Sequence, residues 1–140
     1  MRIFEKDEKT NFVDENNLFV GYDTSQHCCE DFGWAIVEKL PWVDILDPKL
    51  HIEQNGVAYT YEFSLENYRF DPAFIRKFTQ ETDGYGSSSQ GGFVVFKLDD
   101  VTKGDPELYL VLWNFHTGFY SHGFEYKMQE NQKESIEGSL

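Results

Sequence analysis

The sequence predicts an α+β domain that is mostly β, with an antiparallel sheet forming a sandwich or an open barrel and one or two short helices packed on it. Short apolar runs with the two-residue alternation of strands recur along the chain. Turn-forming residues separate these runs at intervals too short for repeated β-α-β crossovers. Aromatic residues, which favour strands, make up 17% of the chain.

A chain of 140 residues fits one domain and can bury a core without support from metal or disulfides. We expect residues 1–128 to form this single globular domain. Residues 129–140, QENQKESIEGSL, are polar and lack apolar periodicity, so we expect a disordered tail there.

The pattern of the N-terminal half predicts strands joined by turns. Residues 10–23, TNFVDENNLFVGYD, place turn formers between two apolar runs, which predicts a hairpin. Residues 32–46 fit either a strand or a helix, and Pro41 ends both. Residues 57–70 alternate as a strand does and follow a strong Asn-Gly turn signal.

Residues 70–80, FDPAFIRKFTQ, carry the local signature of a helix start. Asp71 suits the N-cap and Pro72 suits the first helical position. An apolar stripe would follow on one face, formed by Phe74, Ile75 and Phe78. The next segment, residues 81–92, is rich in Gly and Ser and is either a flexible connector or a binding loop that exposes Tyr85 at its tip.

The C-terminal half predicts three strands, at residues 93–98, 108–116 and 119–128. Thr117-Gly118 would join the last two as a tight hairpin, which we expect to be the most stable part of the fold. A two-residue turn would place His116 and His122 on opposite faces of this hairpin, whereas a bulge would bring them to the same face.

The segment GYDTSQHCCEDFG, residues 21–33, contains both cysteines of the chain. Adjacent cysteines on a strand point to opposite faces, and zinc sites usually space their thiolates by two to four residues, so we expect free thiols without tightly bound zinc. A metal or ligand site remains the alternative reading. Its candidate residues in this segment are Asp23, His27, Cys28, Cys29 and Glu30.

This segment, together with NFHTGFYSHGFE at residues 114–125, resembles a family of small bacterial and phage proteins of uncharacterised activity. In that family a GYD…CCE segment and a later N-x-H-x-G-[FY]-[FY]-x-H segment recur. The resemblance covers residues 18–34 and 110–124 and carries no mechanism. It implies that certain residues lie together in space, namely Asp23, Cys28, Cys29, Glu30, Asn114, His116, Tyr120 and His122.

The formal net charge of −13 limits the classes of partner. Such a surface repels nucleic acid and anionic membranes, so we expect neither as a direct partner. Basic proteins and cations are attracted, although the charge also serves solubility alone. The charged N-terminal residues lack a signal peptide, and no apolar run could span a membrane, so we expect a cytoplasmic protein.

Known catalytic signatures are absent from the sequence, including phosphate-binding loops, nucleophile elbows and zinc-protease motifs. We therefore expect a non-enzymatic domain that docks on a basic protein partner, as inhibitors, immunity proteins and phage counter-defence proteins do. Aromatic residues would anchor the contact, with candidates Trp42, Tyr85 and Phe119. The alternatives are a metal or small-ligand site built from HCCED and the C-terminal hairpin, catalytic or not, and a carbohydrate-binding β-domain.

Overall fold

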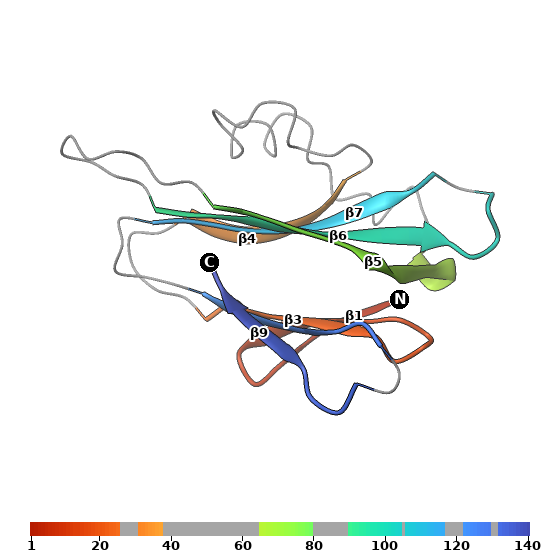
Figure 1. The fold of residues 1–140 in the computed structure, drawn as a ribbon, viewed down its shortest axis with the longest axis horizontal. Coiled ribbons are helices and arrows are strands. Elements are labelled where there is room, and N and C mark those ends of the chain that lie inside the picture. Colours follow the sequence, from red (N-terminus) through yellow and green to blue (C-terminus); the bar gives the residue numbers. More distant parts are fainter. Residues whose placement is uncertain (26–30, 38–64, 80–89, 105, 117–121, 130–131) are drawn as a thin grey trace.

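The computed structural model of the protein describes residues 1–25, 31–37, 65–79, 90–104, 106–116, 122–129 and 132–140. Within these ranges nine strands form two antiparallel sheets that lie face to face, with almost no helix (Figure 1). This arrangement confirms the predicted mostly β, sandwich-like fold. The helix in this part of the chain is the short 3-10 turn η2 (Leu65–Asn67), and no described helix is long and apolar enough to cross a membrane.

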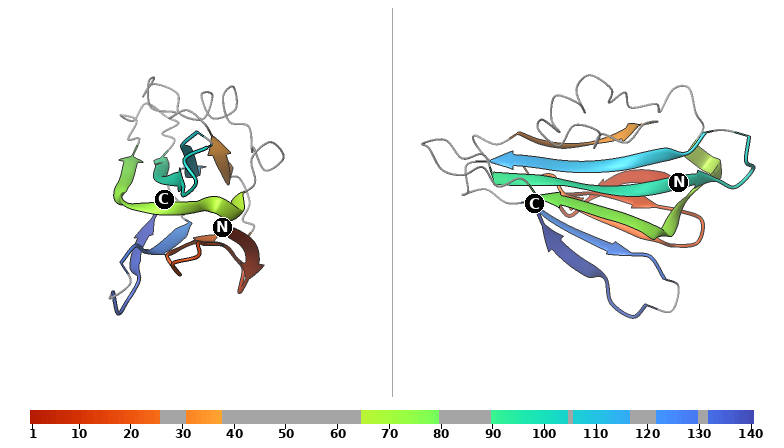
Figure 2. Two further views of the ribbon diagram at one scale, coloured as in Figure 1. Left: turned by 90° about the vertical axis from the view of Figure 1, so that its right-hand side faces the viewer. Right: turned by 45° about the horizontal axis from the view of Figure 1, so that its top comes forward.

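Each sheet combines strands from distant parts of the sequence, and Figure 2 shows the two layers from two further sides. The five-stranded sheet has the order β1 (Arg2–Lys6), β2 (Lys9–Val13), β3 (Phe19–Asp23), β8 (Gly123–Lys127) and β9 (Ile136–Ser139). The four-stranded sheet has the order β4 (Asp31–Val37), β7 (Leu108–His116), β6 (Gln90–Asp100) and β5 (Tyr68–Thr79).

The main core fills the space between the sheets, because alternate residues of each strand point inward. From the five-stranded sheet the core contains Phe12, Val20, Tyr22 and Phe124, and from the four-stranded sheet it contains Ile36, Tyr68, Phe70, Val94, Phe96, Leu98, Leu108, Leu110 and Leu112. The opposite face of the four-stranded sheet carries a second buried cluster of Ala35, Val37, Phe93, Val95, Tyr109 and Val111. Both faces of this sheet are therefore apolar.

The hairpin predicted for residues 10–23 is confirmed, because β2 pairs with β3. Asp14, in the turn of this hairpin, joins the two sheets. One carboxylate oxygen accepts hydrogen bonds from the main-chain N–H groups of Asn16 and Leu18, each at 2.9 Å. The other oxygen accepts the main-chain N–H of Phe70, in β5, at 3.0 Å. The Asp14 side chain is buried, and its bonds with Leu18 and Phe70 are buried as well, so they satisfy N–H groups that water reaches poorly.

The helix predicted for residues 70–80 is wrong, because this segment belongs to β5. Arg76, Lys77 and Phe78 pair with Val95, Val94 and Phe93 of β6. The register shifts between Phe70 and Ile75, and this irregularity accommodates Pro72, which has no N–H to donate. Pairing with β6 and burial against it therefore override the local Asp-Pro helix signal.

The hairpin predicted for residues 108–128 is also wrong. Strand β7 pairs with β4 and β6, whereas β8 pairs with β3 and β9 in the other sheet. Both sides of β7 are thus occupied, and Phe124 of β8 packs on the core from the opposite layer. The predicted position of His116 and His122 on one hairpin does not apply.

The disordered tail predicted for residues 129–140 is wrong for its last part. Strand β9 pairs with β8, and Leu140 is only 5% exposed in the main core. Gly138 allows this approach: a Cβ atom there would lie 2.8 Å from Cε1 of Phe124. Pairing at a sheet edge supplies the order that polar composition did not predict.

The β1–β2 turn offers a stabilising substitution. Asp7 and Glu8 both have positive φ, 55° and 62°, between the paired residues Lys6 and Lys9. This is the geometry of a type I′ turn, whose second central position favours glycine. We expect Glu8→Gly to raise the free energy of unfolding by about 0.5–1 kcal/mol in denaturant melts. Glu15→Gly, at a residue without positive φ, is the control and should give no gain.

Candidate functional site

The described candidates of the sequence analysis are Asp23, Asn114, His116 and His122, of which His116 is described by its main chain alone. The remaining candidates lie outside the described residues, namely His27, Cys28, Cys29, Glu30, Trp42, Tyr85, Phe119 and Tyr120. Residues 32–37 of the ambiguous segment form strand, whereas residues 38–46, 57–64 and 81–89 are outside the described ranges.

The imidazole of His122 is fully buried just before β8. Its Nδ1 lies 2.6 Å from the main-chain oxygen of Asp23, at the end of β3. Because a carbonyl oxygen only accepts hydrogen bonds, Nδ1 carries the proton and donates it. The ring stacks on Phe32 of β4 with a centroid distance of 4.0 Å and an interplanar angle of 22°. These contacts fix both the tautomer and the orientation of the ring.

Asn114 of β7 is also fully buried, and its Nδ2 donates to the main-chain oxygen of Leu140 at 3.1 Å. The main chains of His122 and Leu140 exchange two hydrogen bonds, each of 2.9 Å. Tyr22 of β3 donates its hydroxyl proton to the main-chain oxygen of Trp113 at 2.5 Å. Asn114 and Tyr22 therefore link the two sheets at the end where β3 and β7 finish.

The structure thus brings together the described candidates Asp23, Asn114 and His122: His122 bonds the main chain of Asp23, and both His122 and Asn114 donate to the main-chain oxygen of Leu140. Their interactions are those of a packed structural cluster: two of the three side chains are fully buried, and each bonds a main-chain oxygen. The Asp23 carboxylate accepts hydrogen bonds from the N–H and hydroxyl groups of Ser25. Among the described residues no group of three or more His, Cys, Asp or Glu side chains could hold a metal ion.

A second polar cluster, missed by the sequence analysis, surrounds Lys97 on the outer face of the four-stranded sheet. The ammonium group lies 3.0 Å from Glu107, 3.5 Å from Asp99 and 3.8 Å from Asp71. Its hydrogen bond with Glu107 is the largest cause of a raised pKa of Lys97. The alternation of Lys97 and Asp99 in one strand was the available signal, but the contact with Asp71 depends on the β5 irregularity.

Tyr109 borders the Lys97 cluster and donates a hydrogen bond to Glu107 at 3.3 Å. Burial, and next the nearby Glu107 carboxylate, raise the pKa of the Tyr109 hydroxyl above its ordinary value. The ring also contacts Phe74, at a centroid distance of 5.9 Å. The cluster therefore adjoins aromatic surface and carries more negative than positive charge.

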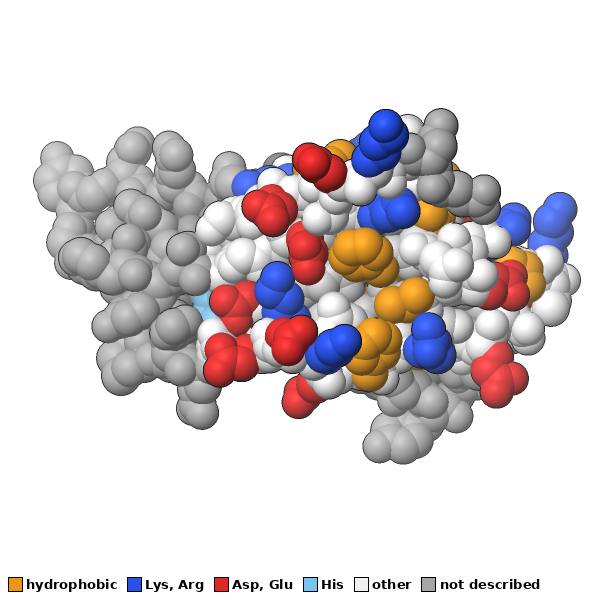
Figure 3. Space-filling view, turned by 90° about the horizontal axis from the view of Figure 1, so that it is seen from below, with side chains coloured by type: hydrophobic (Ala, Val, Ile, Leu, Met, Phe, Trp, Pro, Cys, Tyr) orange, Lys and Arg blue, Asp and Glu red, His pale blue; other side chains and the backbone are white. Residues whose placement is uncertain are grey.

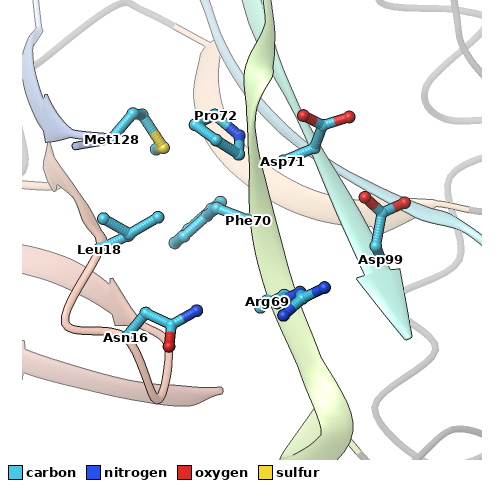
Figure 4. A pocket seen from close by; sticks show the side chains of 8 residues that line it. All are labelled: Asn16, Leu18, Arg69, Phe70, Asp71, Pro72, Asp99 and Met128. Atoms are coloured by element: carbon cyan, nitrogen blue, oxygen red, sulfur yellow. The ribbon is translucent and has the colours of Figure 1, made fainter. Parts of the chain in front are cut away.

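A pocket of about 420 Å³ opens beside the irregular part of β5 (Figure 4). Leu18, Phe70 and Met128 gather on one side of the strand, and Asp71 and Asp99 lie on the other. The volume suits a small molecule. However, the three apolar side chains are between 2% and 6% exposed, so they offer a ligand little apolar area. The pocket therefore supports no functional assignment.

Comparison with known proteins found no match to the chain among family models, curated proteins or solved structures.

Proposed function

We propose that this chain is a non-enzymatic binding domain that docks on a basic surface of another protein in the cytoplasm. The observation that carries the proposal is the formal net charge of −13 in 140 residues. A charge of this size attracts an oppositely charged partner over the Debye length, about 10 Å at 0.1 M salt. Inhibitors, immunity proteins and phage counter-defence proteins are examples of such domains.

The distribution of charge along the sequence supports the proposal. The described residues contain 15 Asp and Glu against 10 Lys and Arg, a net charge of −5. The segments outside them carry the other −8 of the total. The acidic excess thus lies mostly outside the described residues. Acidic side chains concentrated in a few parts of the sequence suit recognition of a basic partner.

The described residues also support a non-enzymatic role. Their buried polar side chains satisfy main-chain groups: Asp14 accepts from three N–H groups, and Asn114 donates to Leu140. The Lys97 cluster adds local negative charge next to Phe74 and Tyr109, and aromatic and charged side chains often share protein interfaces.

The proposal is tested by capturing partners from the native host lysate on the immobilised protein, at low salt and at about 1 M salt, where the Debye length falls to about 3 Å. We expect one basic protein to be recovered specifically at low salt, and its reconstituted complex to weaken as salt rises. Stoichiometric copurification of a small molecule or metal without any protein would contradict the proposal.

A second candidate function, a metal or small-ligand site, is favoured by the geometry of His122. Histidines that bind metal through Nε2 commonly donate Nδ1–H to a carbonyl oxygen, as His122 does to Asp23. Because Nδ1 donates to Asp23, coordination of a metal by this ring would have to use Nε2. Cys28, Cys29 and the other candidates outside the described residues would have to supply the remaining ligands.

Elemental analysis separates these two candidates. We expect Cys28 and Cys29 to be free thiols, so protein purified without chelator should contain zinc only far below one equivalent. The reason is their adjacency, which directs two thiolates to opposite faces of an extended chain. One equivalent of zinc that is lost in Cys29→Ser and in His122→Gln would refute this expectation and establish the metal site.

A further inference from the structure

A row of four side chains crosses the outer face of the five-stranded sheet, with two apolar residues in the middle and a basic residue at each end. The register aligns Arg2 with Val13, Val13 with Phe19, and Phe19 with Lys127. Neighbouring strands are about 4.8 Å apart, so the two basic residues flank the apolar pair at a separation of about 14 Å. All four side chains point outward, because the alternate residues Ile3, Phe12, Val20 and Tyr126 pack on the core.

Phe4 extends the apolar part of this row. It lies two residues from Arg2 on β1, its side chain is 39% exposed, and the Arg2 guanidinium lies 5.9 Å from its ring centroid. Figure 3 shows hydrophobic side chains gathered near the middle of this face, with Lys and Arg side chains next to them. We define the basic-rimmed patch as Arg2, Phe4, Val13, Phe19 and Lys127.

The cations of the basic-rimmed patch form no ion pair with the described residues. Lys9, on the same face, forms an ion pair with Glu125 at 3.2 Å. For Arg2 and Lys127, in contrast, the described residues provide no ion pair within 4.0 Å. The half-buried Phe19 ring lies between the two cations, and the exposed Phe4 ring lies beside Arg2. In a chain of charge −13 this resembles the anatomy of an interface, with an apolar centre and a charged rim.

We propose that the basic-rimmed patch binds an acidic segment of another protein, in which an apolar anchor residue is flanked by carboxylates. The anchor would cover Phe4, Val13 and Phe19, and the carboxylates would pair with Arg2 and Lys127. A basic partner would bind acidic surface, whereas this patch is basic at its rim. The inference therefore stands independently of the proposed function.

Charge favours this occupant over two others. In a face-to-face pair of copies related by a two-fold axis along the strands, Arg2 of one copy would approach Lys127 of the other, and like charges in contact oppose association. An extended anionic membrane would cover the whole face and would therefore also meet the carboxylates of Glu125 and Glu137. A short acidic segment contacts only the patch.

The test is selection of random peptides of about ten residues on the immobilised full chain, followed by measurement of affinity by fluorescence anisotropy. We expect enriched peptides to combine acidic residues with an aromatic or leucine residue. The double variant R2Q/K127Q should weaken their binding by about tenfold or more, as should Phe19→Thr. The matched control, R76Q/K103Q, removes two exposed cations elsewhere and should leave affinity within about twofold.

Unchanged melting temperatures of the variants show that they are folded. Enrichment of basic peptides, equal affinity of the wild type and R2Q/K127Q, or no enrichment at all would overturn the proposal. So would binding to vesicles rich in phosphatidylserine that exceeds peptide binding, or a concentration-dependent dimer that R2Q/K127Q abolishes.

Discussion

Replacement of Asp14 by alanine is expected to lower the free energy of unfolding by about 3–5 kcal/mol. The carboxylate is buried and accepts hydrogen bonds from the N–H groups of Asn16, Leu18 and Phe70. Alanine would leave all three donors without this acceptor and would remove the link between the β2–β3 turn and β5. Denaturant melts of the two proteins measure the difference.

The matched control is Asp71→Ala, since the Asp71 carboxylate accepts one exposed N–H, that of Ala73, and otherwise forms a partly exposed ion pair with Lys97 at 3.8 Å. That substitution should cost less than about 1 kcal/mol. A cost below about 1 kcal/mol for Asp14→Ala itself would show that the carboxylate does not hold the two sheets together.

Leu140→Ala is expected to cost about 2–4 kcal/mol, although a sequence-based reading places this residue in a disordered tail. The side chain is 5% exposed and packs in the main core, and the Leu140 main chain bonds His122 and Asn114. Alanine would leave a cavity at the edge of the core. The unfolding free energy from urea melts is the measured quantity.

Ile136→Ala serves as the control because Ile136 lies in the same strand and is 50% exposed. It should cost less than about 1 kcal/mol. Equal small losses for both variants would mean that β9 is not part of the cooperative fold.

Local patterns predicted the part of the fold that depends on neighbours in sequence. The β2–β3 hairpin, residues 93–98 and residues 108–116 are strands because alternation and turn residues act within a few positions. The helix at residues 70–80 was predicted from an equally local signal, Asp71-Pro72. It fails because pairing with β6, some 20 residues away, decides the conformation.

The placement of β8 shows the same limit at longer range. The tight turn expected at Thr117-Gly118 predicted a hairpin, but the sheet that β8 joins is decided by contacts with β3, about 100 residues earlier. Asp14 was recognised only as a turn former, because its partner Phe70 lies 56 residues away. Its role in joining the sheets was therefore not visible in the sequence.

The candidate site was predicted by residue type and not by geometry. Asp23, Asn114 and His122 do meet, yet the bond between His122 and Asp23 spans 99 positions, and it uses a main-chain oxygen that no motif specifies. The Lys97 cluster was missed because Asp71 reaches it from an irregular strand. Side-chain chemistry was thus readable from the sequence, whereas the partners of each side chain were not.

The central claim, docking on a basic protein, is tested most directly by the association rate constant of the captured partner, measured by stopped flow as a function of salt. The net charge of −13 predicts a rate constant that falls by about tenfold or more between low salt and about 1 M salt, while the dissociation rate changes much less. An association rate constant that stays within about twofold over this range would contradict the claim.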